Sequence, residues 1–201
     1  DPKVRFQLLC TLGSIPGAEA EKISHKLLLR DIEDEWVQIA ALTGPPAQSA
    51  SLLKFVLDNY KDGNTALASL VKRLTTMIGS MGDPIATHHL VQQAASTNSK
   101  ITWQASALEG LAEGMQNDKG TAKLSAADQN LMLKTFFESP SASMRKASLH
   151  MLAVTRQSPG VGAGYIQKAL AIINDSSQPE DKRADAIDFL ALGNPSEHIA
   201  L

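Results

Sequence analysis

Only one cysteine, Cys10, occurs in the 201 residues, so no disulfide can form within the chain. Aromatic residues make up 4% of it, and no apolar run approaches the roughly 20 residues that cross a membrane. Because Ala and Leu dominate the apolar positions, the composition favours packed helices over sheets, which are rich in β-branched and aromatic residues. The net charge is −2 and basic residues occur at most in pairs, so no basic face for nucleic acid is expected.

The chain does contain a short pattern that recurs about every 36 residues. Each copy begins with polar or acidic residues and ends in a run rich in Ala and Leu. A fainter copy has its anchor at Leu74, and the five clear copies align on the anchor residues Arg5, Gln38, Gln104, Arg145 and Arg183. A period in this range is typical of stacked repeat proteins, whose neighbouring units bury a shared core. Such a fold directs the search for function toward a surface.

The apolar residues of each copy have helical spacing. After Arg5 come Leu8, Leu9 and Leu12, at offsets of three, four and seven residues, which place them on one face of a first helix. A second amphipathic helix is expected after each first one, over residues 18–31, 49–60, 84–96, 125–139 and 164–176. We therefore predict about eleven helices, each first helix paired with the second helix that follows it, and no strand.

Capping residues and turns mark where these helices begin and end. A polar residue precedes proline, as expected where a helix begins, at Asp1-Pro2, Asp83-Pro84, Ser139-Pro140 and Asn194-Pro195. Ser125 followed by Asp128 resembles a capping box. Glycines follow the first helices, where a left-handed residue often ends a helix; they are Gly13, Gly44, Gly82, Gly114 and Gly193. Residues 58–64 are expected to form a polar turn, and residues 114–124 the longest loop.

The pattern of an acidic residue, then Val-Arg, an Ala/Leu-rich helix, a short turn and a second amphipathic helix resembles HEAT-like repeats. Asp1, Val4 and Arg5 match it well, and Met144-Arg145 keeps the apolar-Arg pair. The resemblance implies that the arginine pairs with an aspartate of a neighbouring repeat and sets the stacking angle. Gln38 and Gln104 depart from arginine, so such a ladder would be incomplete.

Longer phrases resemble one HEAT segment in particular: DPKVRFQLLCTLGSI, RDIEDEWVQIAAL, LVKRLTTMIGSMGDP and ALEGLAEGM. They are similar to the helical region of bacterial proteins called putative membrane-bound dehydrogenases, which also carry a sugar-dehydrogenase-like propeller and a c-type cytochrome domain. The resemblance implies a spacer within an exported or periplasmic redox protein. Haem attachment through C-x-x-C-H is excluded for this segment by its single cysteine. The start at Asp1 without Met is interpreted as that of an excised piece.

Most candidate sites have a simple structural explanation. His88 and His89 are adjacent on a helix and diverge by about 100°, so they are not expected to share a metal ion, although Asp83 could lie near one of them. The glycine-rich residues 160–164 precede a helix but lack the lysine and the strand of phosphate-binding loops. Cys10 lies on an apolar face and is expected to be a structural thiol. The carboxylates of residues 33–35 and 180–181 suit helix starts.

Two tryptophans, Trp36 and Trp103, lie directly beside or close to an anchor. Tryptophan is enriched in binding hot spots, so the two could form an exposed recognition ridge; packing between repeats is the alternative. Neither needs a cofactor, and none of the patterns predicts a catalytic, cofactor or metal site.

We predict one domain over residues 1–201, a right-handed α-solenoid of five to six HEAT-like hairpins. Its expected function is a non-catalytic interaction or spacer scaffold, monomeric, with protein partners. Other HEAT-like proteins are enzymes, such as alkylpurine DNA glycosylases and bilin lyases. The near-neutral charge argues against the first, and no residue supports a bilin site. An intracellular scaffold also remains open, because export is implied by the resemblance alone.

Overall fold

The computed structural model describes residues 1–45, 48–96, 102–116, 123–155 and 163–192. In these ranges the chain is all-helical, with eleven α-helices and no strand, as predicted. The helices are α1 Pro2–Leu12, α2 Ala18–Arg30, α3 Glu35–Ala41, α4 Ser49–Asp58, α5 Thr65–Ser80, α6 Pro84–Ala95, α7 Trp103–Gln116, α8 Ala126–Glu138, α9 Ala142–Val154, α10 Ala163–Asn174 and α11 Glu180–Leu190.

Several predicted caps form. The side chains of Asp1 and Asp83 accept backbone N–H groups at the starts of α1 and α6, each followed by proline in the first turn. Ser125 caps α8 by accepting the N–H of Asp128. The cap predicted at Ser139 is wrong: α9 begins after Ser141, whose hydroxyl accepts the N–H of Met144.

The glycine predictions are only partly right. Gly82 has a φ of 66°, the left-handed conformation expected after a helix. Gly13 has a φ of −58°, so α1 ends in a right-handed conformation. Gly114 does not end a helix but lies inside α7. There a Cβ would meet the carbonyl oxygen of Thr76 at 2.2 Å, so glycine serves the close approach of α5 and α7. Gly193 lies outside the described residues.

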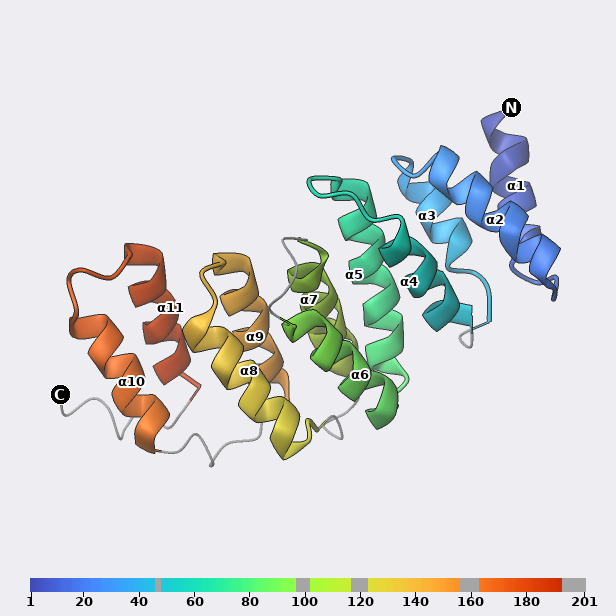
Figure 1. The fold of residues 1–201 in the computed structure, drawn as a ribbon. Helices are drawn as coiled ribbons and strands as arrows, with labels where there is room; N and C mark the ends of the chain where they lie inside the picture. The colour runs from blue at the N-terminus through green and yellow to red at the C-terminus, as the bar shows by residue number, and fades with distance from the viewer. Residues whose placement is uncertain (46–47, 97–101, 117–122, 156–162, 193–201) are drawn as a thin grey trace.

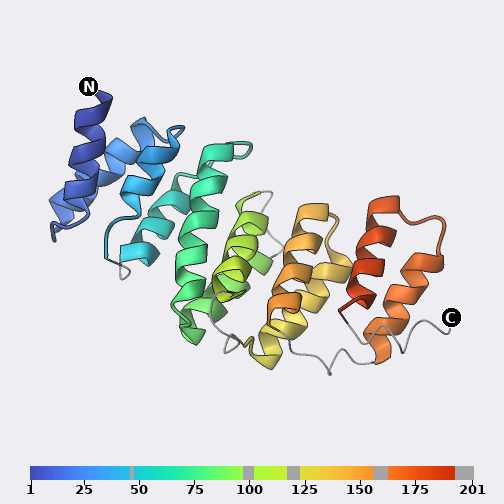
Figure 2. The ribbon, with the colours of Figure 1, turned by 180° about the vertical axis from the view of Figure 1, so that it is seen from behind.

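The helices stand side by side in the order of the sequence, from α1 at one end of the row to α10 and α11 at the other (Figures 1 and 2). The helices that carry the anchors pack on one another as α1 with α3, α5 with α7, α7 with α9, and α9 with α11. We call α1, α3, α5, α7, α9 and α11 the anchor helices. The other helices lie beside them, and α6 packs against α8. The extensive contacts therefore join helices that are one or two positions apart in chain order.

The helices pair differently from the prediction. Between consecutive helices, α1 packs mainly with α2 as predicted, but further along the chain the main pairs are α4 with α5, α6 with α7, α8 with α9, and α10 with α11, so from α5 onward each anchor helix packs with the helix before it. The α8–α9 turn is short and ends at the capping residue Ser141, and the α4–α5 turn ends at the capping residue Asn64. Helical periodicity identifies the helices. It is the same whether an anchor helix pairs with the helix before it or with the helix after it, so it does not decide which neighbours form a hairpin.

The main core runs through the first nine helices. It is deepest between α5 and α7, where Leu70, Leu74, Leu108 and Leu111 are fully buried. A second cluster toward the C-terminus is built around stacked and edge-to-face rings of Phe136, Phe137 and Phe189. Among the described helices, none is both long and apolar enough to span a bilayer.

Candidate functional site

Four of the anchor residues share one role in the structure. In four of the copies the anchor side chain donates a hydrogen bond to a backbone carbonyl at or near the end of the preceding helix. The bonds join Gln38 to Ile32, Gln104 to Ser96, Arg145 to Ser139 and Pro140, and Arg183 to Ile173. Carbonyls at a helix C-terminus lack intrahelical partners, so each anchor closes the turn into its own helix. Glutamine can do this as well as arginine, which explains the two departures from the arginine pattern.

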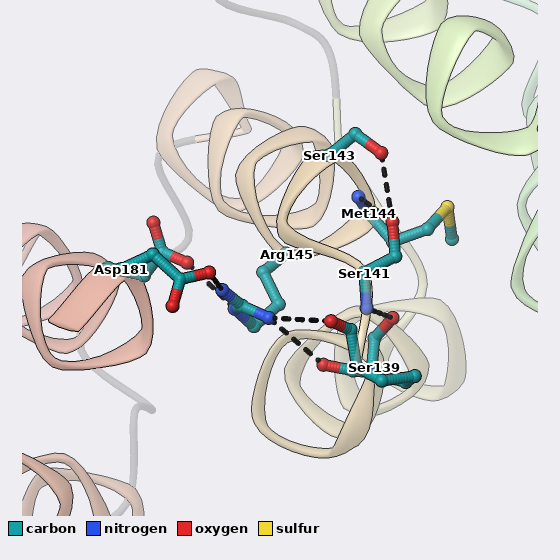
Figure 3. Close-up of polar contacts among 8 residues, drawn as sticks. Ser139, Ser141, Ser143, Met144, Arg145 and Asp181 are labelled. Carbon is teal, nitrogen blue, oxygen red and sulfur yellow. Dashed lines mark hydrogen bonds and ion pairs between the residues drawn. The ribbon is translucent and has the colours of Figure 1, made fainter. Parts of the chain in front are cut away.

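Arg145 makes the largest set of these contacts (Figure 3). Its guanidinium donates to Asp185 through Nε and to Asp181 through Nη2, each at 2.7 Å. Its Nη1 reaches the carbonyl oxygens of Ser139 at 3.3 Å and Pro140 at 3.2 Å. One side chain thus joins the α8–α9 turn to the next anchor helix, α11. Asp181 was predicted only to suit a helix start, and its pairing with Arg145 was missed.

The electrostatics of this network follow from its burial. Only 3% of the Arg145 side chain and 4% of the Asp185 side chain are exposed. Burial opposes the charge of the guanidinium, but the hydrogen bonds that it donates to Asp185 and Asp181 outweigh this effect and raise the pKa of Arg145. The hydrogen bond from Arg145 lowers the pKa of Asp181. The buried pair of Arg145 and Asp185 therefore stays charged and holds α9 against α11.

Arg5 forms the other arginine–aspartate pair of the pattern. Its Nε and Nη2 bind the two carboxylate oxygens of Asp31 at 2.5 and 3.0 Å. Asp31 follows the last residue of α2, so the pair ties α1 to the end of α2. The hydrogen bond from Arg5 lowers the pKa of Asp31. This pair is half-buried, unlike that of Arg145.

A groove of about 570 Å³ lies beside the Arg145 network. It is bordered by the end of α6, the start of α7, the second half of α8 and the start of α9. Its apolar lining comes from Ala94, Ala95, Ala105, Leu131 and Met144. Hydroxyl groups also line it, contributed by Ser96, Thr102, Thr135, Ser139, Ser141 and Ser143. Ser141 and Ser143 bond to each other at 2.9 Å (Figure 3).

The chemistry of the described groove lining suits binding. Its charged residues are Lys134 and Glu138, both near the end of α8, and it includes no His, Cys or Asp. The small alanine and serine side chains leave room for another chain to approach, and the serine and threonine hydroxyls can pair with its polar groups. The lining thus suits an extended peptide segment with small apolar side chains. Sequence reasoning missed this groove, because it forms only where the four successive helices α6 to α9 pack together.

A second polar cluster surrounds Asp128. Its buried carboxylate accepts from His88 Nδ1 at 2.8 Å, Gln92 Nε2 at 3.0 Å and Ser125 Oγ at 2.7 Å. Burial would raise the pKa of Asp128, but these hydrogen bonds outweigh it and lower that pKa. The cluster joins α6 to α8. His88 therefore pairs with a carboxylate 40 residues away, and Asp83, the neighbour considered from the sequence, caps α6 instead.

The other candidates are placed as follows. Trp36 is 68% exposed, whereas Trp103 is 7% exposed and belongs to the core, so the predicted ridge of two exposed tryptophans does not form. Cys10 is half-buried and packs against the core. Most of the glycine-rich stretch 160–164 lies outside the described residues. No cluster of three or more metal-binding side chains occurs in the ranges that the structure describes.

No family model, curated protein or solved structure matches this chain.

Proposed function

We propose that this chain is a right-handed α-solenoid of five to six HEAT-like hairpins that binds or spaces other protein segments without catalysis. The repeated anchor bonds support a stack, because each fixes one anchor helix to the end of the helix before it. The pairing of Arg145 with Asp181 and Asp185 supports rigid stacking of successive copies. A rigid array presents a long surface and holds what is attached to its ends apart.

The groove beside Arg145 is the observation that carries the binding function. It is concave, small side chains line it, and the buried Arg145–Asp185 pair fixes one of its walls. A fixed wall lowers the entropy lost when a partner binds. We propose that the partner enters as an extended peptide whose backbone pairs with the hydroxyls of residues such as Ser141 and Ser143.

The test places a photo-cross-linking amino acid in the groove of the whole chain. Ser143 is exposed at the groove, so its replacement should leave the fold intact. The matched control is the same replacement at Ile85, which is 68% exposed at the other end of α6. Irradiation in the source cell should give an adduct of defined mass at position 143 and none at position 85. Equal labelling at both positions, or none at 143, would contradict the proposal.

We further propose that the scaffold is part of a larger exported redox protein. Its support is the resemblance of the phrases around residues 1–15, 30–42, 70–84 and 107–115 to that family. Trypsin should release Phe6–Lys22, a peptide suitable for detection in fractionated cells. It should be found in the exported fraction, in a polypeptide much longer than 201 residues that stains for covalently attached haem. Recovery in the cytoplasm, or in a haem-free polypeptide, would contradict this assignment while leaving the groove proposal untouched.

A further inference from the structure

The groove beside Arg145 carries two charged side chains on one of its walls. Lys134 and Glu138 of α8 are exposed and line it, whereas the described lining from α6, α7 and α9 contributes no charged residue. The two residues are four positions apart, so they share one face of α8 and are separated by about 6 Å along its axis. A positive and a negative side chain therefore stand one helical turn apart at the groove.

These two charges do not neutralise each other. Within the ranges that the structure describes, neither Lys134 nor Glu138 makes an ion pair or a side-chain hydrogen bond. The same order and spacing occur in α4, where Lys54 binds Asp58 at 2.7 Å although both side chains are exposed. Both charges at the groove are thus available to a partner that lies in it.

Two hydroxyl groups of the lining are left as hydrogen-bond acceptors. Ser96, just after α6, donates its hydroxyl hydrogen to the carbonyl oxygen of Gln93 at 2.8 Å. Thr135 of α8 donates in the same way to the carbonyl oxygen of Leu131 at 2.8 Å. A hydroxyl has one hydrogen to donate and two lone pairs, so both oxygens can still accept. The backbone N–H groups of a peptide are donors that match them.

The charge spacing fits a peptide in an extended conformation that runs along α8. Residues of an extended chain rise about 3.3 Å each and alternate sides, so side chains two positions apart point the same way and lie about 6.6 Å apart. This is close to the separation of Lys134 and Glu138 along α8. The residue between them points the other way, and the lining includes the buried Ala94 and Ala95, which suit a small apolar side chain.

We propose that the groove selects an extended peptide with one acidic and one basic residue two positions apart. The acidic residue lies opposite Lys134, the basic residue lies opposite Glu138, and the residue between them is small and apolar. Because both charges are exposed, they contribute selectivity more than affinity. This inference rests on the proposed binding function and adds the sequence that the partner needs.

The test selects peptides from a displayed library of short random sequences on the immobilised whole chain. The wild-type chain should enrich peptides with an acidic and a basic residue two positions apart. Glu138→Lys leaves two positive charges on the wall, so it should enrich two acidic residues at that spacing. Lys134→Glu should enrich two basic ones. Both positions are exposed, so the variants should stay folded, which circular dichroism verifies.

Fluorescence anisotropy measures how strong the preference is. The best wild-type peptide should bind Glu138→Lys and Lys134→Glu about three- to tenfold more weakly, because each variant replaces an attraction at an exposed site by a repulsion. The matched control is Asp58→Lys, which makes the same change of charge in the exposed pair of α4 and should leave binding unchanged. Added salt should reduce the difference between wild type and the groove variants, since exposed charges are screened.

A photo-cross-linking amino acid at Ser143 separates this inference from the groove proposal. Selected peptides that label position 143 but show the same charge preference in wild type, Glu138→Lys and Lys134→Glu would overturn the charge selection and leave the peptide groove in place. A chain that selects no peptide, or peptides that label Ile85 positions as strongly as position 143, would overturn both.

Discussion

Single side chains link the copies of the repeat, and Arg145 carries the most demanding link. Its guanidinium is 3% exposed and satisfies two aspartates and two carbonyl oxygens. A buried ion pair adds little net stability over an apolar pair of the same shape, but removing one partner leaves an unpaired charge. The anchor position was visible in the sequence; its partners Asp181 and Asp185 in the next copy became evident only when α9 and α11 were seen to pack together.

Replacement of Arg145 should therefore be costly. Arg145→Met should lower the unfolding free energy by about 3–5 kcal/mol, because Asp185 would stay buried without a cation. The double variant Arg145→Met/Asp185→Leu should lose clearly less than the single one, since the unpaired charge is gone. Urea unfolding followed by circular dichroism measures both. A double variant at least as unstable as Arg145→Met would show that the charge is not the cause.

Acid should destabilise the protein through its paired carboxylates. The pKa values of Asp31, Asp128 and Asp181 are lowered by hydrogen bonds, and that of Asp175 falls to about 2. Such groups bind fewer protons when folded, so their stabilisation is complete above the unfolded pKa of about 4 and is lost as pH falls through the folded values. The urea midpoint should drop steeply from about pH 4 to 2. Asp128→Asn should make that drop shallower, and an unchanged slope would contradict the assignment.

His25 should add a separate, gentler effect at higher pH. Burial against Phe55 lowers the pKa of His25, and the nearby charge of Glu21 only partly opposes it. The unfolded chain then binds a proton more readily, so stability should begin to fall as pH drops below about 6.5 and level off below the folded pKa. The same urea series on His25→Gln should lack this shallow step while keeping the loss below pH 4. A step that persists in the variant would assign it to another group.

Among the helices, α5 and α7 make the closest contact, and glycines permit it. A Cβ at Gly110 would lie 2.1 Å from the Lys72 oxygen, and one at Gly79 would lie 2.6 Å from the Leu111 oxygen. Both obstacles are backbone atoms, which cannot rotate away. In the sequence, Gly114 had the appearance of a helix end, because an isolated chain segment does not reveal which helix will press against it. The same limit explains why, from α4 onward, the helices pair differently from the prediction.

Adding one methyl group at this contact should separate the two helices. Gly110→Ala should lower the unfolding free energy by about 1–3 kcal/mol through overpacking, although alanine favours a helix over glycine by about 1 kcal/mol. Gly164→Ala is the matched control: it lies in α10, with no atom within 4 Å of its added Cβ. The control should be neutral or slightly stabilising in urea unfolding. Equal midpoints for the two variants would contradict the close contact.

At the scale of the whole molecule, stability should vary along the row of helices. Most anchor helices pack on neighbouring anchor helices, and within the described residues the first and last helices have such a neighbour on one side only. Leucines at the α5–α7 contact are fully buried, whereas α1 and α2 expose large apolar side chains such as Val4 and Ile23. Helices with fewer packed neighbours should unfold locally more often than those at the centre of the row.

Hydrogen exchange measured by mass spectrometry should show this gradient. Amides of α5 and α7 should exchange most slowly, and those of α1, α2, α10 and α11 faster. In Gly110→Ala the central protection should fall the most, because the change acts at the contact that both helices share. Uniform protection from α1 to α11 would indicate one all-or-none unit instead of a stack.

The sequence by itself determined the helices, many of their starts and the anchor positions. Caps such as Asp83 and apolar spacings such as Leu8, Leu9 and Leu12 act within a few residues, so local order is enough to specify them. Only the tertiary structure decided which helices pair, where the groove lies, and that His88 meets Asp128. Those contacts join residues up to about 40 positions apart, and their geometry depends on how whole helices pack, which small residues such as Gly110 and Gly114 control.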